Sequence, residues 1–159
     1  MSSVKPIPEG FHTITPSLTC KDCANAIEFY KKALGAQELM RMHSPDGTKI
    51  THAELKIGNS MIFVNDEMGP GSAATTGTAS GVSLFLYVEN ADATFDSAVA
   101  AGAKVDMPLE NMFWGDRFGT LTDPYGHKWS VATHVEDLTP EEIGKRAAAF
   151  FAKMAKAAS

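Results

Sequence analysis

An internal repeat constrains the fold of this chain more than any other feature. One offset of 68 residues relates three pairs of residues that typically begin helices or form turns: Asp22 to Asn90, Gly47 to Gly115 and Gly58 to Gly126. Asp and Asn cap helices, while Gly ends helices and forms tight turns. Capping and turn residues that recur at one spacing indicate two copies of the same supersecondary unit. The repeat therefore predicts a chain built from two similar modules.

The first module is predicted to contain a strand, a helix and three further strands. Residues 13–20 alternate between apolar and polar, which is typical of a half-buried strand, and Pro16 places it at a sheet edge because proline has no N–H to donate. Asp22 is expected to cap a helix that ends at Gly35. The next three strands are expected at residues 39–43, 50–57 and 61–64.

The second module is predicted to follow the same order. A strand over residues 82–88 precedes a helix that Asn90 caps and Gly102 ends. The remaining strands are expected near residues 105–109, 117–122 and 129–133. The whole chain, 1–159, is expected to be one domain with module one at 11–66, a Gly/Ala/Ser/Thr-rich connector at 67–81, module two at 82–135 and a terminal helix at 139–157.

The terminal helix has its own start signal. Thr139 is followed by Pro140 and, three positions after Thr139, by Glu142, which is the pattern of a capping box. Its apolar face contains Ile143, Ala147, Phe150 and Met154. We expect this face to dock on the body of the protein, and binding to a partner is the alternative.

Composition excludes several classes of partner. The chain is 44% hydrophobic and 21% charged, and its formal net charge of -5 lacks the basic field that holds nucleic acid. No apolar run approaches the roughly 20 residues of a membrane helix, so no membrane association is expected. Residues 1–6 carry no apolar signal region, and we therefore expect a cytoplasmic protein.

Two cysteines, Cys20 and Cys23, are spaced C-x-x-C. A redox pair and half of a zinc site are two interpretations of this spacing. The third, which we favour, places Cys20 at the end of a strand and Cys23 in the first turn of a helix.

The chain resembles a known family in three stretches of sequence. They are residues 13–18 with 26–36, residues 52–60, and the segment WGDRFGTLTDPYGHKW at 114–129 that leads into 132–137. Over about residues 7–146 the chain is similar to the PhnB-like branch of the vicinal-oxygen-chelate superfamily, which includes glyoxalases, bleomycin-resistance proteins and dioxygenases. The resemblance implies an α+β fold of two tandem βαβββ modules forming an open mixed-sheet barrel around one pocket, plus the C-terminal helix. It also implies a homodimer.

The resemblance also implies where a metal would be held, on the first and last strand of each module. The corresponding residues are Thr15, Ile62 or Phe63 depending on register, Ser83, and Ser130. None of these offers an imidazole, carboxylate or thiolate to a divalent ion. We therefore expect a metal-free pocket, and since the chain has no glycine-rich strand-to-helix turn, we expect no nucleotide-like cofactor.

Strand alternation predicts the residues that line this pocket. The residues expected to bind ligand are Thr15 and Ser17 on the first strand of module one, Ser83, Phe85 and Tyr87 on the first strand of module two, and Ser130 and His134 on its last strand. On residues 51–57 the apolar side chains should face the helices, which leaves His52 and Glu54 inward. This pair is a candidate general base with its orienting carboxylate, and a purely structural hydrogen-bonded pair is the alternative.

The loop from Asn111 to Phe118 gathers large apolar side chains around a Gly-Asp-Arg turn. We expect it to overhang the pocket, with Trp114 as a wall and Arg117 as an anchor for a negatively charged or carbonyl-bearing ligand. In the alternative, Arg117 is paired with a carboxylate such as Glu54 or Asp116, and Trp114 belongs to the core.

Three functions are compatible with these residues. The first is a metal-independent protein that binds or sequesters a small molecule, as bleomycin-resistance relatives do. The second is an enzyme of lyase or dioxygenase type, either metal-free or with a relocated metal at His52 and Glu54. The third is an interaction protein whose pocket is vestigial. The sequence favours the first, without identifying the ligand.

Overall fold

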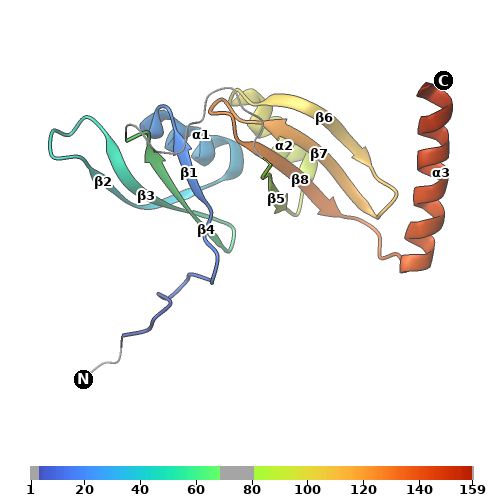
Figure 1. The fold of residues 1–159 in the computed structure, drawn as a ribbon, viewed down its shortest axis with the longest axis horizontal. Coiled ribbons are helices and arrows are strands. Elements are labelled where there is room, and N and C mark those ends of the chain that lie inside the picture. The colour runs from blue at the N-terminus through green and yellow to red at the C-terminus, as the bar shows by residue number, and fades with distance from the viewer. Residues whose placement is uncertain (1–3, 69–80, 159) are drawn as a thin grey trace.

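The computed structural model describes residues 4–68 and 81–158 (Figure 1). The first module contains β1 (Ser17–Cys20), α1 (Cys23–Leu34), β2 (Gln37–His43), β3 (Ile50–Ile57) and β4 (Ser60–Asp66). The second contains β5 (Leu84–Tyr87), α2 (Ala91–Ala100), β6 (Lys104–Asn111), β7 (Asp116–Thr122) and β8 (Lys128–His134), and α3 (Pro140–Ala158) follows. Most of the predicted connector, residues 69–80, lies outside the described residues.

Both modules have the predicted βαβββ topology. The strand orders are β1-β4-β3-β2 and β5-β8-β7-β6, with the first and last strands of each module parallel and the other pairs antiparallel. β1 is an edge strand, as expected, but it begins at Ser17, so that Pro16 precedes the predicted strand instead of lying within it. The described strands form two separate sheets that do not close a barrel, and the modules meet mainly through α1 and α2 (Figure 1).

The pairing register refines the repeat. Ser17 pairs with Phe63 in module one, and Phe85 pairs with Ser130 in module two. The offset is therefore 68 residues for the first strand but 67 for the last. The register also decides which residue of β4 lies on the open face. Phe63 shares a sheet face with Ser17, whereas Ile62 is buried in the core.

Each helix begins against the last strand of its own module. Asp22 and Asn90 cap α1 and α2 as expected, by accepting from Asn25 N and Ala93 N. A second acceptor comes from the sheet: Asp66 Oδ1 accepts from Cys23 N at 2.8 Å, and Thr133 Oγ1 accepts from Ala91 N at 2.8 Å. These bonds satisfy helix N–H groups that have no intrahelical partner.

A buried carboxylate joins the two modules. Asp123, in the turn before β8, accepts from Tyr30 OH at 2.6 Å and from Trp129 Nε1 at 2.9 Å through its Oδ2. Its Oδ1 accepts from Tyr125 N and His127 N, both at 2.9 Å. Because Tyr30 lies on α1, Asp123 ties module one to module two through the core.

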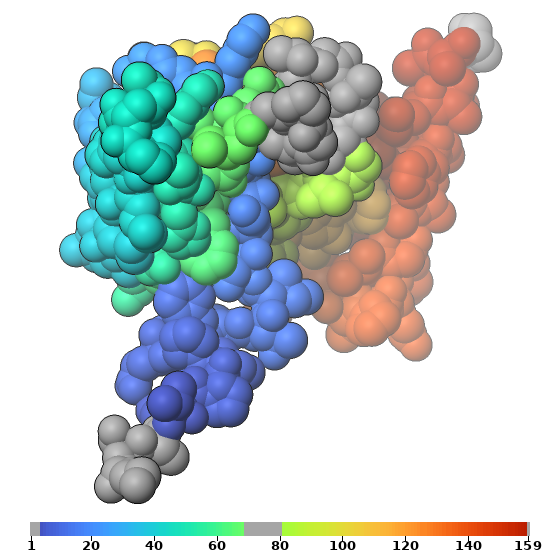
Figure 2. All heavy atoms as spheres, turned by 60° about the vertical axis from the view of Figure 1, so that its left-hand side comes forward, coloured from blue at the N-terminus to red at the C-terminus, as the bar shows by residue number. Residues whose placement is uncertain are grey.

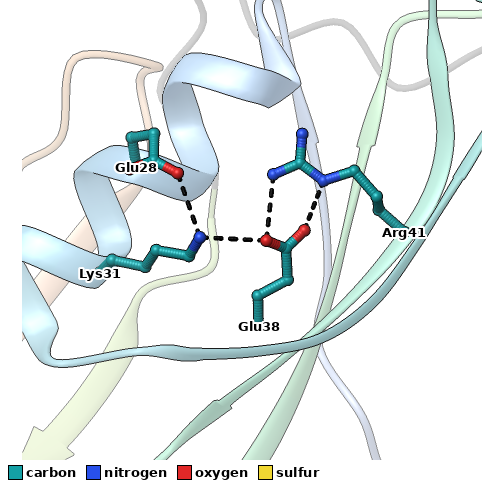
Figure 3. Close-up of polar contacts among 4 residues, drawn as sticks. All are labelled: Glu28, Lys31, Glu38 and Arg41. Atoms are coloured by element: carbon teal, nitrogen blue, oxygen red, sulfur yellow. Dashed lines mark hydrogen bonds and ion pairs between the residues drawn. The ribbon is translucent and has the colours of Figure 1, made fainter.

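Ion pairs fasten helices to sheets on the surface. Figure 3 shows Glu38 of β2 between Lys31 of α1 and Arg41, with Lys31 also bonded to Glu28. Lys31 Nζ lies 3.0 Å from Glu38 Oε1, and Arg41 Nε donates to Glu38 Oε2. The pairs lower the pKa of Glu38, chiefly through the bond from Arg41, and so keep its carboxylate ionised.

The C-terminal helix starts as predicted and docks on the body only in part. Thr139 Oγ1 accepts from Glu142 N, and Thr139 N donates to Glu142 Oε2, which completes the capping box. None of residues 140–158 is buried, and Phe150 instead packs on Phe113 of the β6–β7 loop at a ring distance of 5.2 Å. Figure 2 shows α3 as a column at one side of the body. The predicted face is therefore covered in part: Ile143, Ala147 and Phe150 are half-buried, whereas Met154 is 53% exposed.

No helix in the described parts of the chain is both long and apolar enough to cross a membrane.

Candidate functional site

The open side of the second sheet gathers most of the predicted site residues. Across β5, β8, β7 and β6 the register aligns Phe85 with Ser130, Thr120 and Met107. The next row aligns Tyr87 with Ala132 and Phe118, and the row after that pairs His134 with Asp116. We call the surface formed by these nine residues face two. The alternate residues, including Leu86, Val131 and Leu121, pack into the core beneath α2.

Face two carries a continuous run of aromatic rings. Phe85 lies 4.8 Å from Tyr87 and 5.7 Å from Phe118, with an angle of 26° between the Phe85 and Phe118 planes. Trp114 extends the run, with its ring 5.2 Å from that of Phe118. Phe85 is 50% exposed and Tyr87 62% exposed. Aromatic side chains left this open forfeit burial, and clusters of them mark interaction or ligand sites.

One buried carboxylate holds the polar ends of this run. Asp116 is 2% exposed and accepts from Tyr87 OH, from Trp114 Nε1 and from His134 Nδ1, each at 2.9 Å. Burial raises the pKa of Asp116, but the bonds from His134, Tyr87 and Trp114 outweigh it, so that the pKa lies below its ordinary value. The ionised Asp116 therefore fixes the orientation of two aromatic rings and one imidazole.

His134 is the member of this network that reaches solvent. Its Nε2 lies 2.9 Å from Oδ1 of Asp137, just beyond the end of β8. The bond to Asp116, followed by that to Asp137, raises the pKa of His134 above its ordinary value. The imidazole is held between two carboxylates and thus favours its charged form.

Two hollows adjoin face two. One, of about 200 Å³, lies where the segment before β1 meets β5, and its lining includes His12, Thr15 and Phe85. The other, of about 440 Å³, lies over Ser83, Met107, Thr120 and Ser130. The smaller hollow combines apolar walls with hydroxyl and imidazole groups, as small-molecule sites do, and the larger also has Asp106 and Lys128 in its lining.

The corresponding surface of the first sheet differs in chemistry. The register aligns Ser17 with Phe63, Glu54 and Met40, pairs Thr19 with Asn65, and pairs His52 with Met42. We call the surface formed by these eight residues face one. His52 Nε2 lies 3.3 Å from Glu54 Oε1, and its ring lies 4.7 Å from that of Phe63. His52 and Glu54 are thus neighbours on the open side, as the alternation predicted.

Within one chain the predicted residues fall into two groups. Ser83, Phe85, Tyr87, Trp114, Ser130 and His134 lie on or beside face two, and Thr15 reaches it through the smaller hollow. Ser17, His52 and Glu54 lie on face one. The two faces belong to separate sheets, so the chain by itself does not gather all of these side chains around a single enclosed pocket.

Arg117 lies away from both faces, contrary to its predicted role as a ligand anchor. It points to the helix side of β7, where Nε and Nη2 donate to Asp92 of α2 at 2.7 and 2.8 Å, and Nη1 donates to Asn111 at 3.3 Å. Arg117 thus forms a structural ion pair, which was the alternative interpretation, but its partner is Asp92 instead of Glu54 or Asp116. Alternation with the buried Leu121 on the same strand was the signal that could have placed it.

Sequence reasoning missed the central acceptor of the site. Asp116 was considered only as a partner of Arg117, yet it lies on the opposite side of β7 and bonds Tyr87, Trp114 and His134. Its position opposite His134 depends on the β7–β8 register, which no local pattern specifies. Phe118 and Thr120, which follow at alternate positions, were missed for the same reason.

The residues present do not fit a metal ion of the kind the superfamily plan implies. The four corresponding positions hold Thr15, Phe63, Ser83 and Ser130. In the described ranges, no group of three or more His, Cys, Asp or Glu side chains is arranged to hold a metal ion. Hydroxyl and phenyl groups cannot replace imidazole or carboxylate ligands for a transition metal.

The cysteines take the positions that the structural interpretation predicts. Cys20 ends β1 and Cys23 begins α1, and both are free and buried. Burial raises the pKa of Cys23 to about 12, and burial likewise raises the pKa of Cys20. Thiols that resist ionisation are poor nucleophiles and poor metal ligands.

Comparisons with known proteins agree with this architecture. Residues 10–131 match the family model of the Glyoxalase/Bleomycin resistance protein/Dioxygenase superfamily. An uncharacterized protein of Mycobacterium bovis is 41% identical over 135 residues, which cover 82% of this chain and 88% of that protein. The crystal structure of TioX from Micromonospora sp. ML1 has a TM-score of 0.63 at 25% identity, covering 78% of this chain and 99% of TioX.

A structure from a plant extends the comparison. The Arabidopsis thaliana gene product has a TM-score of 0.62 at 31% identity, covering 77% of this chain and 98% of that one. The match of the family model over most of the chain, together with these relatives, gives the assignment. This chain belongs to the Glyoxalase/Bleomycin resistance protein/Dioxygenase superfamily.

Proposed function

We propose that this protein binds a small, largely apolar molecule on face two. The observation that carries the proposal is the exposed aromatic run, in which Phe85 and Tyr87 are half or more exposed while Ser130 and Ala132, their pairing partners on β8, are buried. Asp116 holds Tyr87 and Trp114 by their polar ends, which leaves the ring surfaces available. Rings that are already fixed lose little conformational entropy when a ligand stacks on them.

Binding on this face is proposed to need no metal. The hydrogen-bonding groups around the aromatic run are Ser83 and Ser130 in the adjoining hollow and His134 at its edge. These groups can orient a ligand through its polar atoms, and the rings supply the affinity. The segment 114–129 that resembles the PhnB-like branch contributes Trp114, Asp116 and Phe118 to the site, which supports placing the chain in that branch.

We propose further that the binding unit is a homodimer. In a single chain, α3 keeps Phe151 and Met154 more than half exposed. A second copy related by twofold symmetry would bury these side chains in pairs and leave face two open to the ligand. Light scattering at micromolar concentration is expected to give twice the chain mass of 17.0 kDa, and a particle of single-chain mass would contradict the dimer.

Native mass spectrometry of the full chain, incubated with a mixed library of small aromatic and aliphatic molecules, tests the binding proposal. Aromatic members are expected to be retained. Replacing Phe85 by Ala should then weaken their binding about tenfold, equivalent to about 1.4 kcal/mol. Phe63→Ala removes the same side chain from face one and is the matched control, which should leave binding unchanged. Retention that survives Phe85→Ala but is lost in Phe63→Ala would move the site to face one.

The second candidate function is acid–base chemistry on face one. The contact between His52 Nε2 and Glu54 Oε1 supports it, because a carboxylate that orients an imidazole prepares it to take a proton. Under this alternative, His52→Gln would abolish turnover of a bound molecule without affecting its retention on face two. Unchanged turnover in the His52→Gln variant would rule out acid–base chemistry by His52 on face one.

A further inference from the structure

His134 stands at the boundary between the fixed network and the solvent. Its Nδ1 bonds the buried Asp116, which also holds Tyr87 and Trp114, so the ring orientation is set from the inside. Its Nε2 bonds Asp137, whose side chain is fully exposed. Among the groups bonded to Asp116, His134 is the one with a second ring N–H to donate to a ligand, because Tyr87 and Trp114 each use their one donor on Asp116.

Both ring nitrogens of His134 face acceptors. Asp116 is held ionised by its three donors, and an ionised carboxylate can only accept. Asp137 contacts the other nitrogen at the same distance of 2.9 Å. A ring that faces a carboxylate on each side donates from both nitrogens, so it presents a positively charged N–H on its outer side.

Asp137 is weakly held compared with Asp116. It follows the end of β8, belongs to no helix or strand, and contacts His134 from a fully exposed position. An exposed ion pair of this kind contributes little to stability because water solvates both of its charges. A second carboxylate can therefore replace it at Nε2 at small cost, whereas losing the buried Asp116 would leave three donors without their shared acceptor.

The aromatic rings lie one row away from this N–H. Asp116 pairs with His134, and the next row of the sheet pairs Phe118 with Ala132, which also pairs with Tyr87. A flat ligand lying on the rings of Tyr87 and Phe118 would thus have its edge directed toward His134. Its acid group would form the same carboxylate–imidazolium–carboxylate arrangement that Asp137 forms in the free protein.

We propose that face two selects planar aromatic acids, whose ring stacks on the aromatic run and whose carboxylate displaces Asp137 from Nε2 of His134. The selectivity rests on the proposed binding function of face two and adds the ligand class. Asp137 then serves as an internal stand-in for the ligand's acid group. This predicts effects of opposite sign at the two ends of the bond between His134 and Asp137: a substitution of His134 should weaken binding of the acid, and a substitution of Asp137 should strengthen it.

The test compares an acid with its neutral amide on the full chain. Isothermal titration calorimetry with 1-naphthoate and 1-naphthamide is expected to show tighter binding of the acid by about tenfold or more, since a charge-assisted hydrogen bond is lost in the amide. His134→Gln keeps a polar side chain without the charge and should bring the two affinities together. Asp137→Ala removes the competing carboxylate and should tighten the acid alone by severalfold.

The outcomes separate the selectivity from the site itself. Equal binding of acid and amide by the wild type, or a preference for the acid that survives His134→Gln, would overturn the selectivity and leave aromatic binding on face two intact. Failure of both probes to bind at millimolar concentration would count against both proposals. Arg117→Met, on the opposite side of β7, is the control and should change neither affinity. Since Asp137 is fully exposed, its variant tests the proposal even if His134→Gln folds poorly.

Discussion

The two modules have the same topology and differ in what they leave open. On the helix side they are built alike, with a capped helix, an acceptor on the last strand and an ion pair from the helix to a neighbouring strand. On the open side, face one carries hydroxyls, an amide and the His52–Glu54 pair, whereas face two carries aromatic rings around Asp116. The comparison teaches that the packed side specifies the fold, while the open side is free to take a different chemistry in each module.

The largest expected effect concerns two buried carboxylates, Asp123 in the turn before β8 and Asp66 at the end of β4. Asp123→Ala would strand four donors, two of them side chains from different modules, whereas Asp66→Ala would strand the two backbone donors Cys23 N and Ile50 N. At about 1 kcal/mol for each bond, the free energy of unfolding should fall by about 4 kcal/mol for Asp123 and about 2 kcal/mol for Asp66. Urea denaturation of both variants measures the difference.

Equal losses in the two variants would contradict this ranking and would mean that Asp123 does not join the modules. Trp129→Phe is a milder control, because it removes one donor to Asp123 and leaves an aromatic ring in the core.

A second difference lies at equivalent positions on the helix side. Ala53 of β3 pairs with Val64, and Gly119 of β7 pairs with Val131. A Cβ at Gly119 would lie 2.8 Å from the Phe95 ring, 3.0 Å from Met107 O and 3.1 Å from Leu109 N, because irregular pairing of β6 brings its backbone close. Gly119→Ala should therefore destabilise the protein by about 2 kcal/mol through overpacking.

The reverse change, Ala53→Gly, is the matched control and should cost about 1 kcal/mol through added backbone freedom. Thermal unfolding of the two variants measures both effects. A Gly119→Ala variant as stable as the wild type would show that β6 can move away from β7.

Sequence patterns were sufficient for the fold because they are local. Capping by Asp22 and Asn90, the glycine at position 35 and the capping box at Thr139 each specify an element boundary within a few residues. Period-two alternation also placed His52 and Glu54 on the open side of β3 correctly. The repeat then related the two modules, since equivalent boundaries recur in the same order.

The patterns failed where a partner is distant in sequence. Arg117 and Asp92 are 25 residues apart, and nothing near either residue indicates the other. The same applies to two of the three partners of Asp116, since Tyr87 on β5 is 29 residues away and His134 on β8 is 18 residues away. For α3, amphipathicity predicted an apolar face but could not specify what covers it. Register and packing decide such contacts, and both are properties of the whole fold.

The third prediction concerns pH and the charge that distinguishes face two. The bonds to Asp116 and then to Asp137 raise the pKa of His134, so its contribution to stability is complete below the unfolded histidine value, about 6.5, and is lost as pH rises through the higher folded value. Asp116, with a lowered pKa, contributes above the ordinary carboxyl range and loses its contribution as pH falls. Tyr87 and Trp114 are the other polar groups bonded to Asp116.

The difference in stability between the wild type and His134→Gln should therefore be largest between the carboxyl range, where Asp116 is protonated, and the histidine range, where His134 loses its charge. It should shrink at pH values below the first and above the second. Denaturant unfolding at a series of pH values measures it. A difference that grows as pH rises above the histidine range would have the wrong sign for a stabilising imidazolium.

The smallest effect is expected for Arg117→Met, which keeps the bulk of the side chain and removes its charge. Arg117 is paired with Asp92 on the surface, where water screens both groups, so the melting temperature should fall by less than in the Asp66 and Gly119 variants. Glu38→Gln is the matched change in module one, because Glu38 also joins a helix to a strand through surface ion pairs (Figure 3). Both variants alter the helix side and leave the open faces intact, so aromatic ligands should bind them as they bind the wild type. A loss of ligand affinity in Arg117→Met with unchanged melting would place the arginine in the site after all, and the separation between a packed side for folding and an open side for binding would no longer hold in module two.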